Sequence, residues 1–396
     1  MPELSDRINH PISTAELERR WTAVRSAMDA RGIDVLVTQS SNPDWGYVRY
    51  LADLPHSGYG TTVIFPRSEP MTVVVHGPLG GDVAVDPAGD GELRGVQRVL
   101  MNPYFPAAHF TQQMDTDLTS TAMRPYGNRT VGVVGANHMP SPLVDSLRRD
   151  IAGGQLVDAT DLVDEIKVIK SEEEQVLIRR TAQLQDAAMS AAIAAIKPGA
   201  RDRDVAAAAE HVSRSMGSEY GVYMVGSSAP GDPAARPRPA HQQERVIQAG
   251  DIVAILVENS GPGGYYCELG RTAVLGRAPH RLLEEHVRVR EAQQATLDRL
   301  RPGVSCAEIW QAHNDHMTAL DRPIESRIHA HGQGYDLVER PVVRFDEPMP
   351  LRADMNITCH PAYVHEGLYS WICDNHLTRD GAPEAIHSFT AEITEV

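Results

Sequence analysis

This 396-residue chain repeats two sets of landmarks in its second half, each at nearly the same distance. Pro198-Gly and Pro302-Gly both precede an acidic residue and a predicted helix, and the two prolines are 104 positions apart. Asp251 and Asp354 each open a short stretch rich in apolar residues, and they are 103 positions apart. Pro-Gly before a helix is common by itself, but two landmarks with nearly one offset favour a duplicated helix–strand unit. Two such units predict outer helices and a sheet-lined cleft between the halves.

The N-terminal part of the chain alternates helical patterns with short apolar stretches. Ser13-x-x-Glu16 is typical of a capping box, and apolar residues follow it at helical spacing up to Gly32. Apolar runs predict strands at residues 33–38, 61–65, 71–75 and 131–134. This alternation indicates an α/β domain.

A second capping box, Ser171–Glu174, opens a long Ala-rich helix. The stretch just before it, Ile166–Lys170, is the best candidate for a domain boundary. A chain of this length also exceeds one ordinary hydrophobic core. We therefore predict an α/β protein with two domains, residues 1–165 and residues 166–396.

Composition limits the classes of partner. The chain has 37 Lys and Arg against 53 Asp and Glu, a net charge of −16, which argues against nucleic acid and anionic membrane as partners. No apolar run approaches the ~20 residues of a membrane span, and Met1–Asp6 does not resemble a signal peptide. The four cysteines form no Cys-x-x-Cys motif, which is typical of a reduced protein. We expect a cytoplasmic protein that binds a small molecule.

Side chains with metal-ligand chemistry recur on strand-like stretches of the second half. Glu268 lies three residues before Arg271, His360 ends an apolar stretch before a proline, and Cys373 precedes an aspartate. His331 starts a His-Gly-x-Gly motif that is followed by an acidic residue and a proline. Glu, His and Cys side chains are all competent ligands for zinc or iron. Arg271 is expected to be structural, holding an acid within the sheet.

These motifs, in this order, resemble the creatinase/prolidase/aminopeptidase P family, the pita-bread hydrolases. The resemblance covers nearly the whole chain and rests on the segments 1–160, 163–171, 248–251, 264–272, 331–341 and 374–381. It implies a creatinase-type N-terminal α/β domain and a C-terminal pita-bread α+β domain with an internal pseudo-twofold. It also implies a homodimer in which the N-terminal domain of one chain borders the site of the other.

The peptidase site that the resemblance implies holds two metal ions with two Asp, one His and two Glu side chains. Matched by position, the His is His331 and the second Asp becomes Glu268. The two Glu become His360 and Cys373, so the carboxylates that bridge two metals are mostly replaced.

Two further positions depart from the family pattern. The first Asp falls on Val257, while the adjacent Glu258 is expected on the other face of the sheet because neighbouring strand residues alternate. The catalytic His becomes Val338, which cannot exchange a proton. A divergent member with a degenerate metal site is expected, and an Xaa-Pro peptidase is the least favoured function.

We favour a metal-free, creatinase-like hydrolase that cleaves a C–N bond of a small polar amino or guanidino compound. In creatinase a His before the Gly-Asp strand acts as acid and base, and the nearest candidate here is His241. The catalytic residues would then be His331, His241, Glu268 and His360. No cofactor is expected under this hypothesis.

Two alternatives stay open. One divalent ion, zinc or iron, could be held by Glu268, His331, His360 and Cys373 in a hydrolase or a lyase. The chain could also be a non-catalytic binding protein on the same fold. Under each hypothesis, we predict three substrate-binding residues. Tyr335 and Arg340 follow His331, and His376 lies on the strand-like stretch after Cys373.

Overall fold

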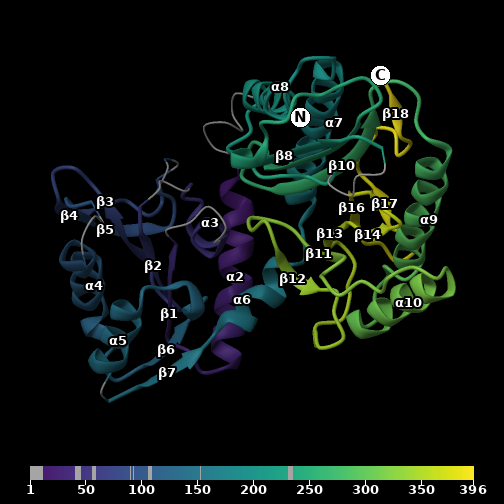
Figure 1. Cartoon of the computed structure of the whole chain (residues 1–396). Helices are drawn as coiled ribbons and strands as arrows, with labels where there is room; N and C mark the ends of the chain where they lie inside the picture. The colour runs from purple at the N-terminus through teal and green to yellow at the C-terminus, as the bar shows by residue number, and fades with distance from the viewer. Residues whose placement is uncertain are drawn as a thin grey trace. The chain divides into compact units, whose positions relative to one another are not determined.

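The computed structural model describes residues 12–40, 46–55, 59–89, 91, 93–105, 109–151, 153–230 and 235–396 (Figure 1). The segment Met1–Asp6, whose polar character argued against a signal peptide, lies outside these residues. The chain divides into two compact units, Met1–Lys167 and Val168–Val396. Among the described residues, no helix has both the length and the apolar content that a bilayer crossing needs.

The first unit is built on a seven-stranded sheet in the order β4-β5-β3-β2-β1-β6-β7. The helix α2 (Thr14–Ala30) begins where the capping box predicted, because the Ser13 side chain accepts a hydrogen bond from the Glu16 amide. The four expected strands are present as β1, β2, β3 and β6. The strands span Val35–Ser40 (β1), Thr61–Pro66 (β2), Met71–His76 (β3), Gly81–Ala84 (β4), Val96–Asn102 (β5), Thr130–Val133 (β6) and Gln155–Asp158 (β7). The other helices are α3 (Gly46–Ala52), α4 (His109–Met123), α5 (Ser141–Asp150) and α6 (Thr160–Lys167).

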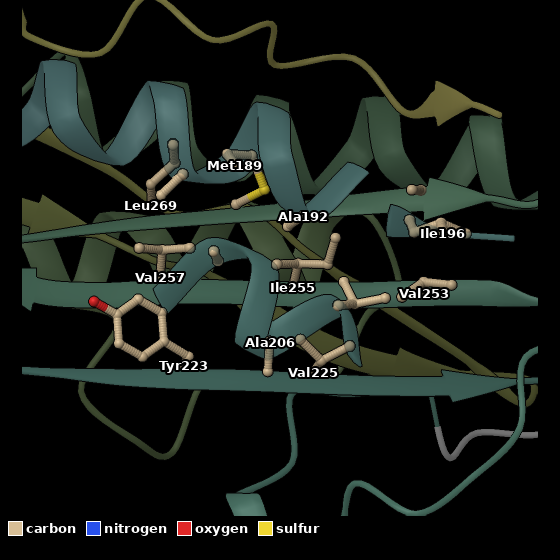
Figure 2. Packing of buried hydrophobic residues seen from close by; sticks show 14 of the residues in the cluster. Met189, Ala192, Ile196, Ala206, Tyr223, Val225, Val253, Ile255, Val257 and Leu269 are labelled. Atoms are coloured by element: carbon tan, nitrogen blue, oxygen red, sulfur yellow. The ribbon is translucent and has the colours of Figure 1, made fainter. Parts of the chain in front are cut away.

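The first half of the second unit packs two helices against a mainly antiparallel sheet. The Ser171–Glu174 capping box is present with both of its hydrogen bonds at the start of α7. Apolar side chains of the helices and the strands form one core cluster, which includes Met189, Ile255 and Leu269 (Figure 2). The elements are α7 (Glu172–Ala195), α8 (Asp202–Ser215), β8 (Tyr220–Ser228), β9 (Ile252–Ser260) and β10 (Tyr266–Val274), and the sheet order is β18-β10-β9-β8, with β18 at Thr394–Glu395.

The second half of this unit again combines two helices, α9 (His280–Leu297) and α10 (Cys306–Ala319), with a sheet. The sheet order is β12-β11-β13-β16-β17, and a separate hairpin pairs β14 with β15. These strands span Ala330–Gly332 (β11), Glu339–Val342 (β12), Asn356–Cys359 (β13), Ala362–His365 (β14), Leu368–Trp371 (β15), Asp374–Leu377 (β16) and Glu384–Ala385 (β17).

The two halves share the local geometry that the repeated landmarks predicted. Gly199 and Gly303, one in each Pro-Gly pair, have φ angles of 87° and 86°. Residues that carry a Cβ atom rarely adopt this backbone conformation. The Gly199 amide donates to Ile247 O at 3.0 Å, and the Gly303 amide donates to Leu351 O at 2.9 Å. Because the same hydrogen bond recurs 104 positions later, the duplicated helix–strand unit is confirmed.

Candidate active site

The hairpin of β9 and β10 places two acidic side chains side by side. In its antiparallel register Glu268 lies directly opposite Glu258, and Leu269 lies opposite Val257. Directly opposite residues point to the same face of a sheet, so Glu258 shares the face of Glu268. Val257 and Leu269 instead belong to the apolar core on the other face (Figure 2). The expectation that Glu258 points away from the site is therefore wrong.

The two histidines of the site come from the other half of the unit. His331 lies on β11, which pairs with β13, and His360 directly follows β13. The two imidazole rings are 5.1 Å apart between centroids and meet edge to face at 63°. His331 Nδ1 lies 2.9 Å from Gly332 O. A carbonyl only accepts, so this contact assigns the proton to Nδ1 and leaves the lone pair on Nε2.

Glu268, His331 and His360 each present one ligand atom, and these three atoms lie within 4.8 Å of one another. His331 Nε2 and Glu268 Oε2, for example, are 4.0 Å apart. Burial lowers the pKa of His331 to about 4 and that of His360 well below its usual value, so both rings are neutral near pH 7. Neutral imidazole is the form that binds a metal ion. Two imidazoles and one carboxylate fit a single zinc or iron ion.

The carboxyl group of Glu268 is also buried, and burial raises its pKa to about 7. Hydrogen bonds from Cys373 and Thr358 partly oppose this rise. A nearby cation would favour the ionised form of such a group. Burial without a cation disfavours the ionised form of Glu268, and a bound metal ion would restore it. The environment of Glu268 is therefore that expected of a metal ligand.

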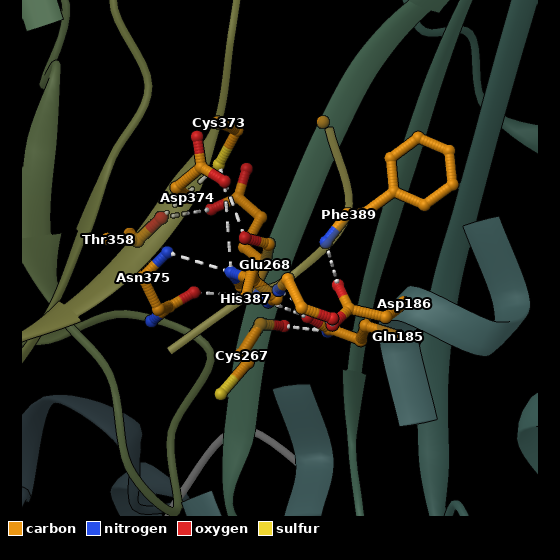
Figure 3. A network of polar contacts seen from close by, with 12 residues as sticks. Gln185, Asp186, Cys267, Glu268, Thr358, Cys373, Asp374, Asn375, His387 and Phe389 are labelled. Carbon is orange, nitrogen blue, oxygen red and sulfur yellow. Dashed lines mark hydrogen bonds and ion pairs between the residues drawn. The ribbon is translucent and has the colours of Figure 1, made fainter. Parts of the chain in front are cut away.

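Cys373 lies close to this group but is not one of its three members. Its thiol is 3.3 Å from Thr358 Oγ1 and 3.6 Å from the carbonyl oxygen of Glu268 (Figure 3). Burial, followed by the charge of Glu268, raises the pKa of the thiol well above its usual value. The structure thus places Cys373 beside Glu268 but outside the group of three side chains whose ligand atoms lie within 4.8 Å of one another.

A cavity of about 540 Å³ opens in front of the three candidate ligands. Two cations contribute to its wall, Arg236 and Arg327, and the rings of Tyr369 and Trp371 stack there with centroids 6.2 Å apart. The remaining wall is mainly apolar, with Glu258 as a further acid. The wall consists of Met224, Arg236, Pro237, Leu256, Glu258, Glu268, Arg327, His331, Leu337, His360, Ala362, Tyr363, Val364, Tyr369 and Trp371.

Besides Cys373, four of the residues predicted from the sequence lie outside this cavity wall. His241 is exposed on a short 3-10 turn, where its ring contacts the Gln242 amide. Tyr335 is buried and packs on the Tyr265 ring at 4.3 Å. The other two are Arg340, which pairs with Glu347 at 2.5 Å, and His376, which is buried on β16.

Arg271 holds an acid within the sheet, as the sequence predicted. Its guanidinium lies 2.6 Å from Asp374, and both side chains are largely buried. Arg271 also donates to the backbone carbonyls of Thr390 and Phe389. Burial by itself would raise the pKa of Asp374, but the Arg271 charge holds it below the usual value. The residue before Asp374 exchanges two backbone hydrogen bonds with Gly270, which joins the two sheets at the site.

Comparison with known proteins identifies the family. The model of metallopeptidase family M24 matches residues 176–386, which is more than half of the chain. The chain belongs to metallopeptidase family M24. The uncharacterized hydrolase/peptidase y4tM of Sinorhizobium fredii is 30% identical over 336 residues, which cover 81% of each chain. The Xaa-Pro dipeptidase of Pyrococcus horikoshii is 27% identical over 242 residues, 59% of this chain and 66% of that protein.

Solved structures of the family share the fold of this M24 protein. The Xaa-Pro dipeptidase of Bacillus anthracis superposes with a TM-score of 0.76 at 19% identity, covering 96% of this chain and 100% of the other. The dipeptidase PepE of Mycobacterium ulcerans gives 0.74 at 21% identity and covers 97% and 99%. The pita-bread architecture predicted from the sequence is therefore confirmed, and the protein is a hydrolase of this family.

The family also corrects one prediction. A protein without any cofactor was expected, but the M24 enzymes are metallopeptidases. The described residues of this chain bring three candidate ligands together inside the cavity. The metal-free hypothesis is wrong because it treated the replaced ligand positions as losses. His360 replaces a carboxylate with another ligand, and the buried neutral rings keep their capacity to bind a metal ion.

Three cavity residues escaped sequence reasoning. Glu258 was set aside because the family spacing marks the adjacent Val257, and neighbouring strand residues face opposite sides of a sheet. The register of β9 with β10 instead puts Glu258 directly opposite Glu268. Arg236 and Arg327 lie outside regular strands and helices, and no motif marks them.

Proposed function

We propose that this M24 protein is a one-metal hydrolase that cleaves a C–N bond of a small substrate carrying a carboxylate. The observation that carries the proposal is the group formed by Glu268, His331 and His360 at the wall of the cavity. A divalent cation held by these residues would polarise a carbonyl group and provide an activated water. The likeness to dipeptidases supports hydrolysis, since their names describe cleavage of a peptide bond.

The chain differs from a two-metal peptidase in the residues that would hold the second ion. Only one carboxylate belongs to the three-ligand group, whereas paired metals need bridging carboxylates. Val338, at the position of the family's catalytic His, is 47% exposed and lies outside the cavity wall. These differences support one ion and a substrate other than the Xaa-Pro dipeptide of the relatives.

The protein purified without a chelating tag is expected to hold one zinc or iron ion per chain. The physical reason is that three ligand atoms converge on one position. Elemental analysis after dialysis against buffer measures the ratio, and a sample treated with a chelator and then dialysed serves as the control. Two tightly bound ions per chain, or none after incubation with either metal, would contradict the proposal.

We assign the binding of the substrate carboxylate to the two arginines of the cavity wall, Arg236 and Arg327. Arg327 pairs with Glu325 through Nε and Nη2, and its Nη1 has no hydrogen-bond partner among the described residues. Arg236 has no ion pair with any residue that the structure describes. Guanidinium groups bind carboxylates through charge-assisted hydrogen bonds. The aromatic wall beside them would exclude water from the bound substrate.

Replacing Arg327 with Met is expected to weaken binding of butyrate, a simple carboxylate probe, by about tenfold, the low end for a hydrogen bond to a charged group. The metal content should stay unchanged because Arg327 is not one of the three candidate ligands. Isothermal titration calorimetry on the metal-loaded protein measures both affinities. Arg277→Met, an exposed site outside the cavity wall, is the matched control. Equal affinity for butyrate in the Arg327 variant and the control would remove Arg327 from substrate binding.

A further inference from the structure

Three side-chain amides are buried where the sheet of β11, β13 and β16 contacts β10, namely those of Gln333, Asn356 and Asn375. Gln333 and Asn375 are fully buried, and Asn356 is 1% exposed. Burying an amide is unfavourable unless hydrogen bonds satisfy its donors and its acceptor. None of the three residues belongs to the cavity wall, so contact with a substrate does not explain them.

One backbone hydrogen bond fixes the orientation of the Asn375 amide. The Glu268 backbone N–H donates to Asn375 Oδ1 at 2.7 Å (Figure 3). A backbone N–H can only donate, so the other end of the Asn375 amide is the nitrogen. That nitrogen donates to Gln333 Oε1 at 2.8 Å and to Asn356 Oδ1 at 3.0 Å. The orientations of all three amides follow from this single contact.

The nitrogens of the other two amides complete the network. Gln333 Nε2 donates to Glu258 Oε1 at 3.1 Å and to Leu337 O at 3.0 Å. Asn356 Nδ2 donates to Tyr266 O at 3.2 Å and to Gln333 O at 3.3 Å. Each amide nitrogen thus donates twice and each amide oxygen accepts. A buried network that is satisfied in this way is rigid and specifies one arrangement of its segments.

The network connects the segments that carry the three candidate metal ligands. Through Asn375 it holds the backbone of Glu268, on β10 in the first half of the unit. It reaches the second half through Gln333, two residues after His331, and through β13, which ends one residue before His360. A metal ion requires its ligand atoms at fixed distances from one another. A shift between the halves would separate the carboxylate from the two imidazoles.

We propose that Asn375 is a positioning residue for the metal ion, because its amide holds the ligand of the first half at binding distance from the two ligands of the second half. This inference rests on the proposed function and adds the part of the chain that sets the affinity of the site. Asn375 is not itself a ligand. It acts through the backbone of Glu268 and the side chains of Gln333 and Asn356.

Asn375→Leu keeps nearly the volume of the side chain and removes the centre of the network. Its affinity for Zn²⁺ is expected to fall 10–100-fold, as is typical when a residue that supports a metal ligand is lost. Competition between the full-length, metal-free protein and a chromophoric zinc chelator measures this affinity. Urea unfolding of the same metal-free protein measures stability separately.

Asn259→Leu is the matched control. Asn259 is also fully buried, and its side chain bonds with Gln185, Ser218 and Tyr223, all in the first half of the unit. Both variants lose a buried, hydrogen-bonded amide, so both should unfold at lower urea concentration than the wild type. Only Asn375→Leu should lose zinc affinity, because only its amide joins the two halves.

Wild-type zinc affinity in Asn375→Leu, or an equal loss of affinity in the control, would overturn the assignment. If Asn375→Leu does not fold, Gln333→Met decides, since it removes the amide that joins Asn375 to the His331 segment. Wild-type affinity in that variant would overturn the assignment as well. Failure of the proposed function has a different signature. A wild type that holds no metal would overturn both, whereas one ion bound equally well by wild type and variants would overturn only the role of Asn375.

Discussion

Replacing His331 with Ala is expected to remove the bound metal ion and to lower turnover at least a hundredfold, because even residues that only support a ligand typically cost 10–100-fold. His331 supplies one of three ligand atoms, and its Nδ1 contact with Gly332 O directs Nε2 toward Glu268. The free energy of unfolding of the metal-free protein should change by only ~1–2 kcal/mol, typical of one substitution. Elemental analysis and urea unfolding with a chelator present measure the two effects.

His241→Ala is the matched control, since His241 is exposed and lies outside the cavity wall. This variant should keep both metal and turnover, which would exclude the acid–base role that the sequence suggested for it. His360→Ala should behave like His331→Ala, whereas Cys373→Ser should retain the metal because Cys373 is not in the ligand group. Full metal content in His331→Ala would refute the assignment of the site.

Replacing Arg271 with Met is expected to lower the free energy of unfolding by ~3–5 kcal/mol, the usual cost of removing one partner of a buried ion pair. The Asp374 carboxylate would lose its charged partner at 2.6 Å, inside the protein. The carbonyls of Thr390 and Phe389 would lose their donor as well, which would release the C-terminal segment from β10. Urea unfolding of the metal-free protein, followed by tryptophan fluorescence, measures the loss.

Arg344→Met provides the comparison for this change. Arg344 also pairs with an aspartate, Asp346 at 2.7 Å, but both side chains are about half exposed. Pairs of this kind typically contribute 0–1 kcal/mol, so the control should unfold at nearly the wild-type urea concentration. If the Arg271 variant were as stable as the Arg344 variant, Arg271 would not be the structural link between β10 and the C-terminal segment.

The sequence located the candidate ligands better than it located their neighbours. Glu268, His331 and His360 carried ligand chemistry at motif positions, and the structure brings these three together. Cys373 has the same ligand chemistry. Whether a side chain can join the group, however, depends on distances of a few ångströms between atoms of two sheets, and the number of residues between motifs does not specify these distances. Tyr335 and Arg340, which the sequence predicted to bind substrate, follow His331 closely in the chain. In the structure Tyr335 packs on the Tyr265 ring and Arg340 pairs with Glu347.

Local patterns in the sequence determined the elements of this protein and its duplicated halves. Capping boxes, Pro-Gly pairs and apolar periodicity act over a few residues, so they can be identified without the fold. Only the tertiary structure decided the composition of the cavity. The pairing of β9 with β10 turned Glu258 toward the site, because strand register, and not the count from a family motif, sets which face a side chain occupies. The packing of segments far apart in sequence then added Arg236 and Arg327 to the same wall.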